Sequence, residues 1–231
     1  MKKGLLIITM KPSILVGGQA VIEGVMMRVP GSYATAVRDP NGKIHIQKED
    51  FKSITESSSF WRRPIFRGMA SLYESMKMGM KTLNYSADIA MPDEEPQSKF
   101  AELFSTIFAI SLAVFLFMIA PMWMTTKVMD LEKEAFWFNL VSGGFRIAFF
   151  ILYLLIISML SDVRRLFQYH GAEHRVVYNF ESGKKVNIKN AQSFPTQHPR
   201  CGTSFLFIVL LSAILVFAIV DTAVINIFGT I

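Results

Sequence analysis

Three long apolar segments occupy the chain from residue 100 onwards. Residues 103–126 and 201–220 carry no charged side chain, and residues 136–161 carry one, Arg146. Because about 20 apolar residues suffice for a helix to cross a bilayer, the pattern predicts three transmembrane helices at about these positions. The third ends where Asp221 interrupts it. A charge in mid-membrane is costly, so we expect Arg146 to face protein or to extend towards the membrane surface.

The hydropathy pattern before residue 100 is different. Two β-prone runs flank Asn41-Gly42, a pair typical of hairpin turns. Residues 64–90 carry apolar side chains three and four positions apart, which predicts one face of an amphipathic helix. Its methionines and basic residues suit a helix that lies on the bilayer or across the other helices. The apolar positions are Ile65, Met69, Leu72, Tyr73, Met76, Met80 and Leu83.

The predicted fold is mainly α: a polytopic α-helical membrane protein with a small α+β cytoplasmic N-terminal region. We assign residues 1–99 to a cytoplasmic or interfacial region and residues 100–231 to a transmembrane region, with a cytoplasmic loop at 162–200. In composition, 52% of the 231 residues are hydrophobic and 18% are charged, whereas soluble domains carry about 25% charged residues. These values exclude a disordered chain and an ordinary soluble domain, and the single cysteine excludes an internal disulfide.

Basic residues near the ends of transmembrane helices mark the cytoplasmic side. Here they gather before the first predicted helix and after the second, which places the N-terminus and the 162–200 loop in the cytoplasm and the acidic connection at 130–134 outside. No basic run alternates with aromatic residues, so we expect no nucleic-acid partner. The expected partners are the lipid bilayer and a protein partner or second copy of the chain. The basic residues are Arg62, Arg63, Arg67, Lys99, Arg164, Arg165 and Arg175.

Three of the four histidines and the only cysteine lie within 32 residues. His170 and His174 have the i, i+4 spacing that puts two imidazoles on one face of a helix, which we expect to continue from the second transmembrane helix. His198 and Cys201 precede the third. Imidazole and thiolate ligands together favour zinc over magnesium or calcium. The alternative is that all four are polar residues capping helix ends at the membrane surface.

Glu173 decides what such a metal site would do. His170, Glu173 and His174 match the His-x-x-Glu-His pattern of the inverzincins, in which the glutamate polarises the attacking water and a distant glutamate, here Glu181 or Glu23, is the third ligand. This favours a metal-dependent hydrolase acting on a membrane-proximal peptide or lipid-linked group. A closed set of three histidines and a cysteine would instead make the site structural, in a non-enzymatic membrane scaffold or partner-binding protein.

Transport is a third possibility, but it requires several polar groups facing one path through the membrane. Only Arg146 and Asp221 lie within hydrophobic sequence, so transport ranks last.

Residues 17–28 form a second unusual group. Glutamine, glutamate and arginine stand there among glycines and apolar residues, although unpaired charges are expensive in a core strand. One interpretation is a loop that brings Glu23, with Arg28, into a cofactor site at the metal. The other is an edge segment in which Glu23 pairs with Arg28.

Residues 17–28, 169–174 and 198–205 together resemble the YqhQ family, a bacterial membrane family of unknown function whose members are often labelled predicted metal-dependent enzymes. The resemblance covers residues 17–217 and implies a protein of the bacterial inner membrane with a metal site. Family members continue beyond the point where this chain ends. That implies either an incomplete last helix or a separate chain that supplies the rest.

Overall fold

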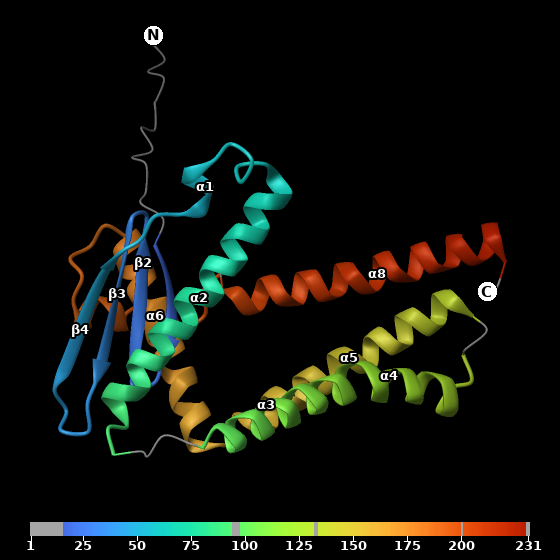
Figure 1. Ribbon diagram of the computed structural model, residues 1–231, viewed down its shortest axis with the longest axis horizontal. Coiled ribbons are helices and arrows are strands. Elements are labelled where there is room, and N and C mark those ends of the chain that lie inside the picture. The colour runs from blue at the N-terminus through green and yellow to red at the C-terminus, as the bar shows by residue number, and fades with distance from the viewer. Residues whose placement is uncertain (1–15, 94–97, 132–133, 200, 230–231) are drawn as a thin grey trace, which may run out of the picture. The chain divides into compact units, whose positions relative to one another are not determined.

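The computed structural model of the protein describes residues 16–93, 98–131, 134–199 and 201–229 (Figure 1). Two predicted features fall partly outside them: the acidic connection, at residues 132–133, and the segment before the third apolar helix, at residue 200. The chain divides into two compact units, the first formed by residues up to 93 with 165–198, the second by residues 94–164 with those from 199 onwards. Each unit is described by itself.

The first unit contains an antiparallel sheet in which four strands pair in chain order. The strands are β1 (Gly17–Val21), β2 (Gly24–Val29), β3 (Ser32–Arg38) and β4 (Ile44–Asp50). The predicted hairpin is confirmed, because β3 pairs with β4 and Gly42, in the connection between them, has a φ of +84°. Glycine adopts this conformation without the steric cost that a β-carbon adds.

Helix α2 (Pro64–Ala90) crosses one face of the sheet and α6 (Ser161–Glu181) lies on the other (Figure 1). The predicted amphipathic helix is therefore confirmed, with proline at its first position. Most of the predicted apolar stripe, however, is exposed: Met76 is 66% exposed and Met80 is 63% exposed. Met78, which lies outside that stripe, packs in the core of the sheet. The side of α2 that the first unit buries is mostly small or polar and consists of Ala70, Glu74, Met78, Gly79, Thr82 and Ser86.

Successive residues of β1 point to opposite faces of the sheet, and this explains its glycine. A β-carbon on Gly18 would lie 2.5 Å from Cγ of Glu173 in α6. The next side chain, Gln19, points the other way, and its Oε1 would lie 2.8 Å from a β-carbon on Gly79 of α2. Both helices thus approach β1 closely. The short helices α1 (Ile54–Ser57) and α7 (Ile188–Gln192) complete the described elements of this unit.

The second unit is helical and has three helices long and apolar enough to cross a membrane. The first runs through α3 (Lys99–Val114), η1 (Phe115–Ile119), α4 (Ala120–Trp123) and η2 (Met124–Val128). Its wider π turns lie on both sides of Pro121, which lacks a backbone donor. The others are α5 (Ala135–Ile157) and α8 (Gly202–Phe228), which pack together at Gly143. The chain is thus mainly α with a small antiparallel sheet.

Two boundaries differ from the sequence prediction. The expectation of one helix from the second apolar segment into His170 is wrong, because α5 ends at Ile157 and α6 begins at Ser161. The amides of Met159 and Leu160 bond to carbonyls three residues back, which tightens the chain out of the α-helix. Helix α8, conversely, continues through Asp221, because the Asn139 side-chain amide donates to its carboxylate at 2.9 Å.

Candidate metal site

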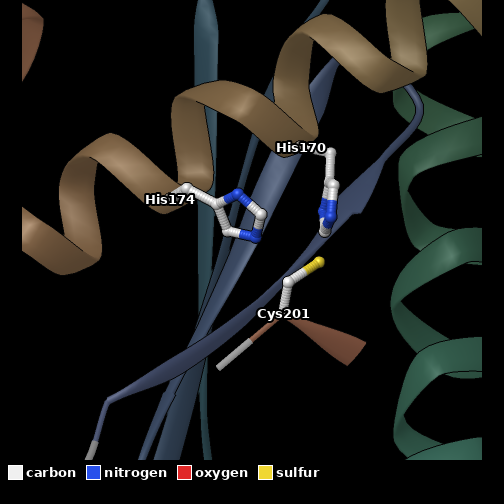
Figure 2. Close-up of side chains that lie close together, drawn as sticks. All are labelled: His170, His174 and Cys201. Atoms are coloured by element: carbon white, nitrogen blue, oxygen red, sulfur yellow. The ribbon is translucent and has the colours of Figure 1, made fainter. Parts of the chain in front are cut away.

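Helix α6 presents His170, Glu173 and His174 together. The two imidazoles project from the same side of the helix (Figure 2), with ring centroids 4.3 Å apart. Between them in sequence lies Glu173, whose Oε2 is 3.5 Å from Nε2 of His174 and 3.7 Å from Nδ1 of His170. Because residues three and four apart on a helix are neighbours, the His-x-x-Glu-His spacing alone brings these donor atoms together.

His174 is fixed by a backbone contact that the sequence does not reveal. Its Nδ1 lies 2.6 Å from the carbonyl oxygen of Thr196. A carbonyl can only accept, so Nδ1 carries the proton and donates it. The lone pair of a neutral His174 is therefore on Nε2, the nitrogen that faces Glu173. Metal-ligating histidines are oriented in the same way, by donating their second ring nitrogen to a carbonyl or carboxylate.

Burial sets the charges of these groups. Burial lowers the pKa of His170, and repulsion from His174 lowers it further. The pKa of His198 is also lowered by burial and by His174, against an opposing effect of Glu173. Burial raises the pKa of the Glu173 carboxyl, while His174 and His198 act in the opposite direction. For His170 and His198 the lowered pKa favours the neutral imidazole, which is the form that binds metal.

His198 lies next to this group and is almost completely buried. Its ring centroid is 5.8 Å from that of His174 and 4.3 Å from that of Tyr178. Its Nε2 is 3.6 Å from Oε2 of Glu181. The structure thus brings three of the four histidines into one neighbourhood and puts Glu181 beside the third.

Cys201 belongs to the second unit, where it is the N-cap of α8 and its Sγ lies 2.9 Å from the Thr203 hydroxyl. It is also drawn in Figure 2. Since consecutive Cα atoms are about 3.8 Å apart, Cys201 cannot be more than about 11 Å along the chain from His198. Chain connectivity therefore keeps it available as a ligand.

Glu23 has partners other than the one predicted. It stands in the β1–β2 turn with a φ of +50°, and its carboxylate pairs with Arg165 and with Arg38 and accepts from the Tyr169 hydroxyl at 3.0 Å. Pairing with Arg28 is therefore wrong: the Arg28 guanidinium lies 4.3 Å from the ring centre of Phe51 instead. Glu23 fixes the hairpin to α6 next to His170. A role of Glu23 or Arg28 in binding a cofactor stays a prediction.

The fold and these side chains define a class: a helical chain with three apolar helices and a histidine-rich group beside a small sheet. A family model described as "Protein of unknown function (DUF1385)" matches residues 63–230, and the chain belongs to this family. It is 29% identical over 224 residues to the "Uncharacterized protein YqhQ" of Bacillus subtilis (strain 168), covering 89% of this chain and 69% of that protein. The resemblance to the YqhQ family is thus confirmed. No solved structure matches the chain.

Proposed function

We propose that this chain is a multi-pass protein of the bacterial inner membrane that binds one zinc ion and hydrolyses a membrane-proximal peptide or lipid-linked group. His170 and His174 bind the metal, His198 or Cys201 supplies a further ligand, and Glu173 is the general base. The observation that carries the proposal is the Thr196 carbonyl, which fixes the protonated nitrogen of His174 and leaves Nε2 to a metal.

The residues present fit a zinc ion. Ligand atoms at zinc distances in a tetrahedron lie about 3.4 Å from one another, and a donor nitrogen of His170 lies within 4.8 Å of one of His174. A neutral imidazole need not lose a proton to bind a metal. Zinc, when bound, supplies Lewis-acid chemistry at neutral pH.

Glu173 is positioned to move a proton. Its carboxylate lies against both imidazoles. Strand β1 approaches the Glu173 side chain closely at Gly18. A carboxylate in that position accepts a proton from the attacking water and returns it to the leaving group, as a general base does. The His170 side chain is 36% exposed, so water and a substrate can reach this side of the group.

A structural metal site is the second candidate, and the burial of His198 favours it. Only 3% of this side chain is exposed, beside His174 and three residues before Cys201. If both His198 and Cys201 bind, four protein ligands close the site and no position remains for water.

Insertion into the membrane is supported by the length and apolar character of the three helices. The cytoplasmic position of the N-terminus and of α6 is supported by the basic residues before the first apolar helix and after the second.

The test is the zinc content of the purified full chain, measured by mass spectrometry for the wild type, His174→Ala and His45→Ala. We expect about one zinc per wild-type chain, none in His174→Ala, and an unchanged content in the control. His45 is a matched control because its Nε2 binds Asp39 at 2.9 Å in the sheet. Equal zinc content in all three proteins would refute the proposal.

A second variant, Glu173→Gln, separates the enzyme from the structural site. For an enzyme we expect zinc and melting temperature to be retained and complementation of a deletion strain to be lost, because only the proton acceptor has gone. For a structural site, zinc affinity falls by about 10–100-fold together with stability.

A further inference from the structure

A row of polar side chains runs along α5 and lines an open cavity of the second unit. Asn139, Arg146 and Tyr153 are spaced seven residues apart, which is about two helical turns, so they lie on nearly the same side of the helix. All three line one cavity of about 660 Å³. Small-molecule sites commonly have volumes of about 300–1,000 Å³. Of this row, only Arg146 stands out in the sequence.

The rest of the cavity wall is apolar. Phe117 of η1 lies across from α5, with its ring centroid 6.2 Å from that of Tyr153. Leu210 and Phe217 of α8 form another part of the wall. One polar row opposite aromatic and aliphatic walls suits a ligand with a polar head and a hydrocarbon chain, and not a fully hydrated ion.

Two polar groups of α5 lack the hydrogen bonds that burial demands. Nε of Arg146 and Oγ of Ser142, one turn earlier, are buried and have no hydrogen-bond partner among the residues that the structure describes. Asn139, by contrast, donates to Asp221. Arg146 as a whole is half-buried, and an intramembrane arginine pairs with an acidic partner or marks a functional site. We therefore expect the partner of Arg146 to be an anion.

The depth of Arg146 excludes the ordinary lipids around the helices as that partner. It lies eleven residues from Ala135 and eleven from Ile157, the two ends of α5. At 1.5 Å per residue it is about 16 Å from either end, which is the middle of a bilayer. A headgroup at the membrane surface does not reach it. The acidic head must enter between the helices.

We propose that this cavity binds one acidic lipid, with its phosphate or carboxylate head paired to Arg146 and its acyl chain along Phe117, Leu210 and Phe217. The Tyr153 hydroxyl, on the same helix, also lines the cavity and is an additional donor. The inference rests on the proposed membrane insertion of the three helices, but not on the metal.

The test uses the full chain, purified in a mild detergent and stripped of lipid, with binding counted by native mass spectrometry. The probe is dioctanoyl phosphatidate; the comparators are dioctanoyl phosphatidylcholine and inorganic phosphate. We expect one phosphatidate per chain, preferred over phosphatidylcholine by about 30-fold or more, as for a buried charge pair. Arg146→Gln should remove most of this preference. Arg164→Gln, which removes an exposed arginine outside the cavity, should keep it.

A second variant protects the test against misfolding of Arg146→Gln. Leu210→Trp fills the acyl side of the cavity and leaves the charge in place, so it should weaken phosphatidate binding while zinc content and melting temperature stay the same. Equal binding of phosphatidate and phosphatidylcholine, full competition by inorganic phosphate, or unchanged binding in both variants would overturn the proposal. Absence of zinc from the purified wild-type chain would overturn the proposed function but not the proposed lipid site.

Discussion

Helices α2 and α5 share one pattern and differ in one respect. Both bury mostly small or polar residues and leave most of their large apolar ones exposed, the reverse of a helix in a soluble protein. In α2 every buried polar side chain has a partner: Glu74 accepts from Ser53, and Thr82 and Ser86 donate to carbonyls of their own helix. In α5, Ser142 and Arg146 present buried atoms with no such partner in the described part of the chain. We infer that the polar face of α2 serves folding and that of α5 serves a ligand.

The largest expected effect contrasts one buried polar residue from each helix. Glu74→Ala removes the acceptor of the Ser53 hydroxyl and of the Ile54 amide, and should cost about 3 kcal/mol, because two part-buried donors lose a charged partner. Ser142→Ala removes a hydroxyl that bonds to nothing described and should be neutral or slightly stabilising. Melting temperatures of both variants in detergent check this. A similar loss of melting temperature in the two variants would contradict the proposed difference between α2 and α5.

The next largest expected effect concerns the packing of α6 against the sheet. Gly18→Ala puts a β-carbon against Glu173 and should cost about 1–3 kcal/mol, as overpacking does. Gly17→Ala is the control, because its β-carbon would meet nothing within 4 Å. Hydrogen exchange of the α6 amides should increase in the first variant only. Equal exchange in both variants would mean that the contact with Glu173 does not hold α6.

A smaller effect is expected where α5 packs on α8. Gly143→Ala puts a β-carbon 2.6 Å from side-chain atoms of Ile214, and should cost about 1 kcal/mol, because Ile214 must shift to make room. The neighbouring Gly144→Ala meets nothing within 4 Å and should keep or raise the melting temperature, since alanine favours the helix. If Gly144→Ala is the more damaging of the two, the packing of α5 is assigned to the wrong face.

The smallest effect concerns pH in the first unit. Hydrogen bonds from Lys81 and Tyr33 lower the pKa of Glu49. A lowered pKa contributes stability at pH values above the unfolded pKa, and that stability is lost as the pH falls through the folded one. Glu49→Gln should therefore reduce the melting temperature slightly at pH 7, and the difference from the wild type should vanish as the pH falls through the folded pKa of Glu49. If the difference in melting temperature between Glu49→Gln and the wild type grew as the pH fell, the predicted direction of the pH dependence would be wrong.

Patterns that depend on neighbours along the chain were predictable from the sequence. The β3–β4 hairpin follows from Asn41-Gly42, α2 from its apolar spacing, and the three long helices from uncharged runs. The side-by-side imidazoles of His170 and His174 follow from i, i+4 spacing alone.

Features that need distant segments were not predictable. The acceptor for His174 is the backbone of Thr196, which has no side-chain signature. The Arg165 and Arg38 partners of Glu23 come from α6 and β3, so nearness in sequence pointed wrongly to Arg28. The Gly17-Gly18 pair was the one available signal of a close helix contact. The face that α2 buries also could not be read, because an apolar stripe packs inward in water and outward in lipid.

The central claim is that His170 and His174 bind zinc, and X-ray absorption at the zinc edge of the purified full chain tests it most directly. We expect at least two imidazole nitrogens at about 2.0–2.1 Å from zinc, with a sulfur at about 2.3 Å if Cys201 is a ligand. His174→Ala should lose the imidazole signal, and His45→Ala should keep it. A wild-type spectrum with oxygen ligands alone, or one unchanged in His174→Ala, would contradict the account.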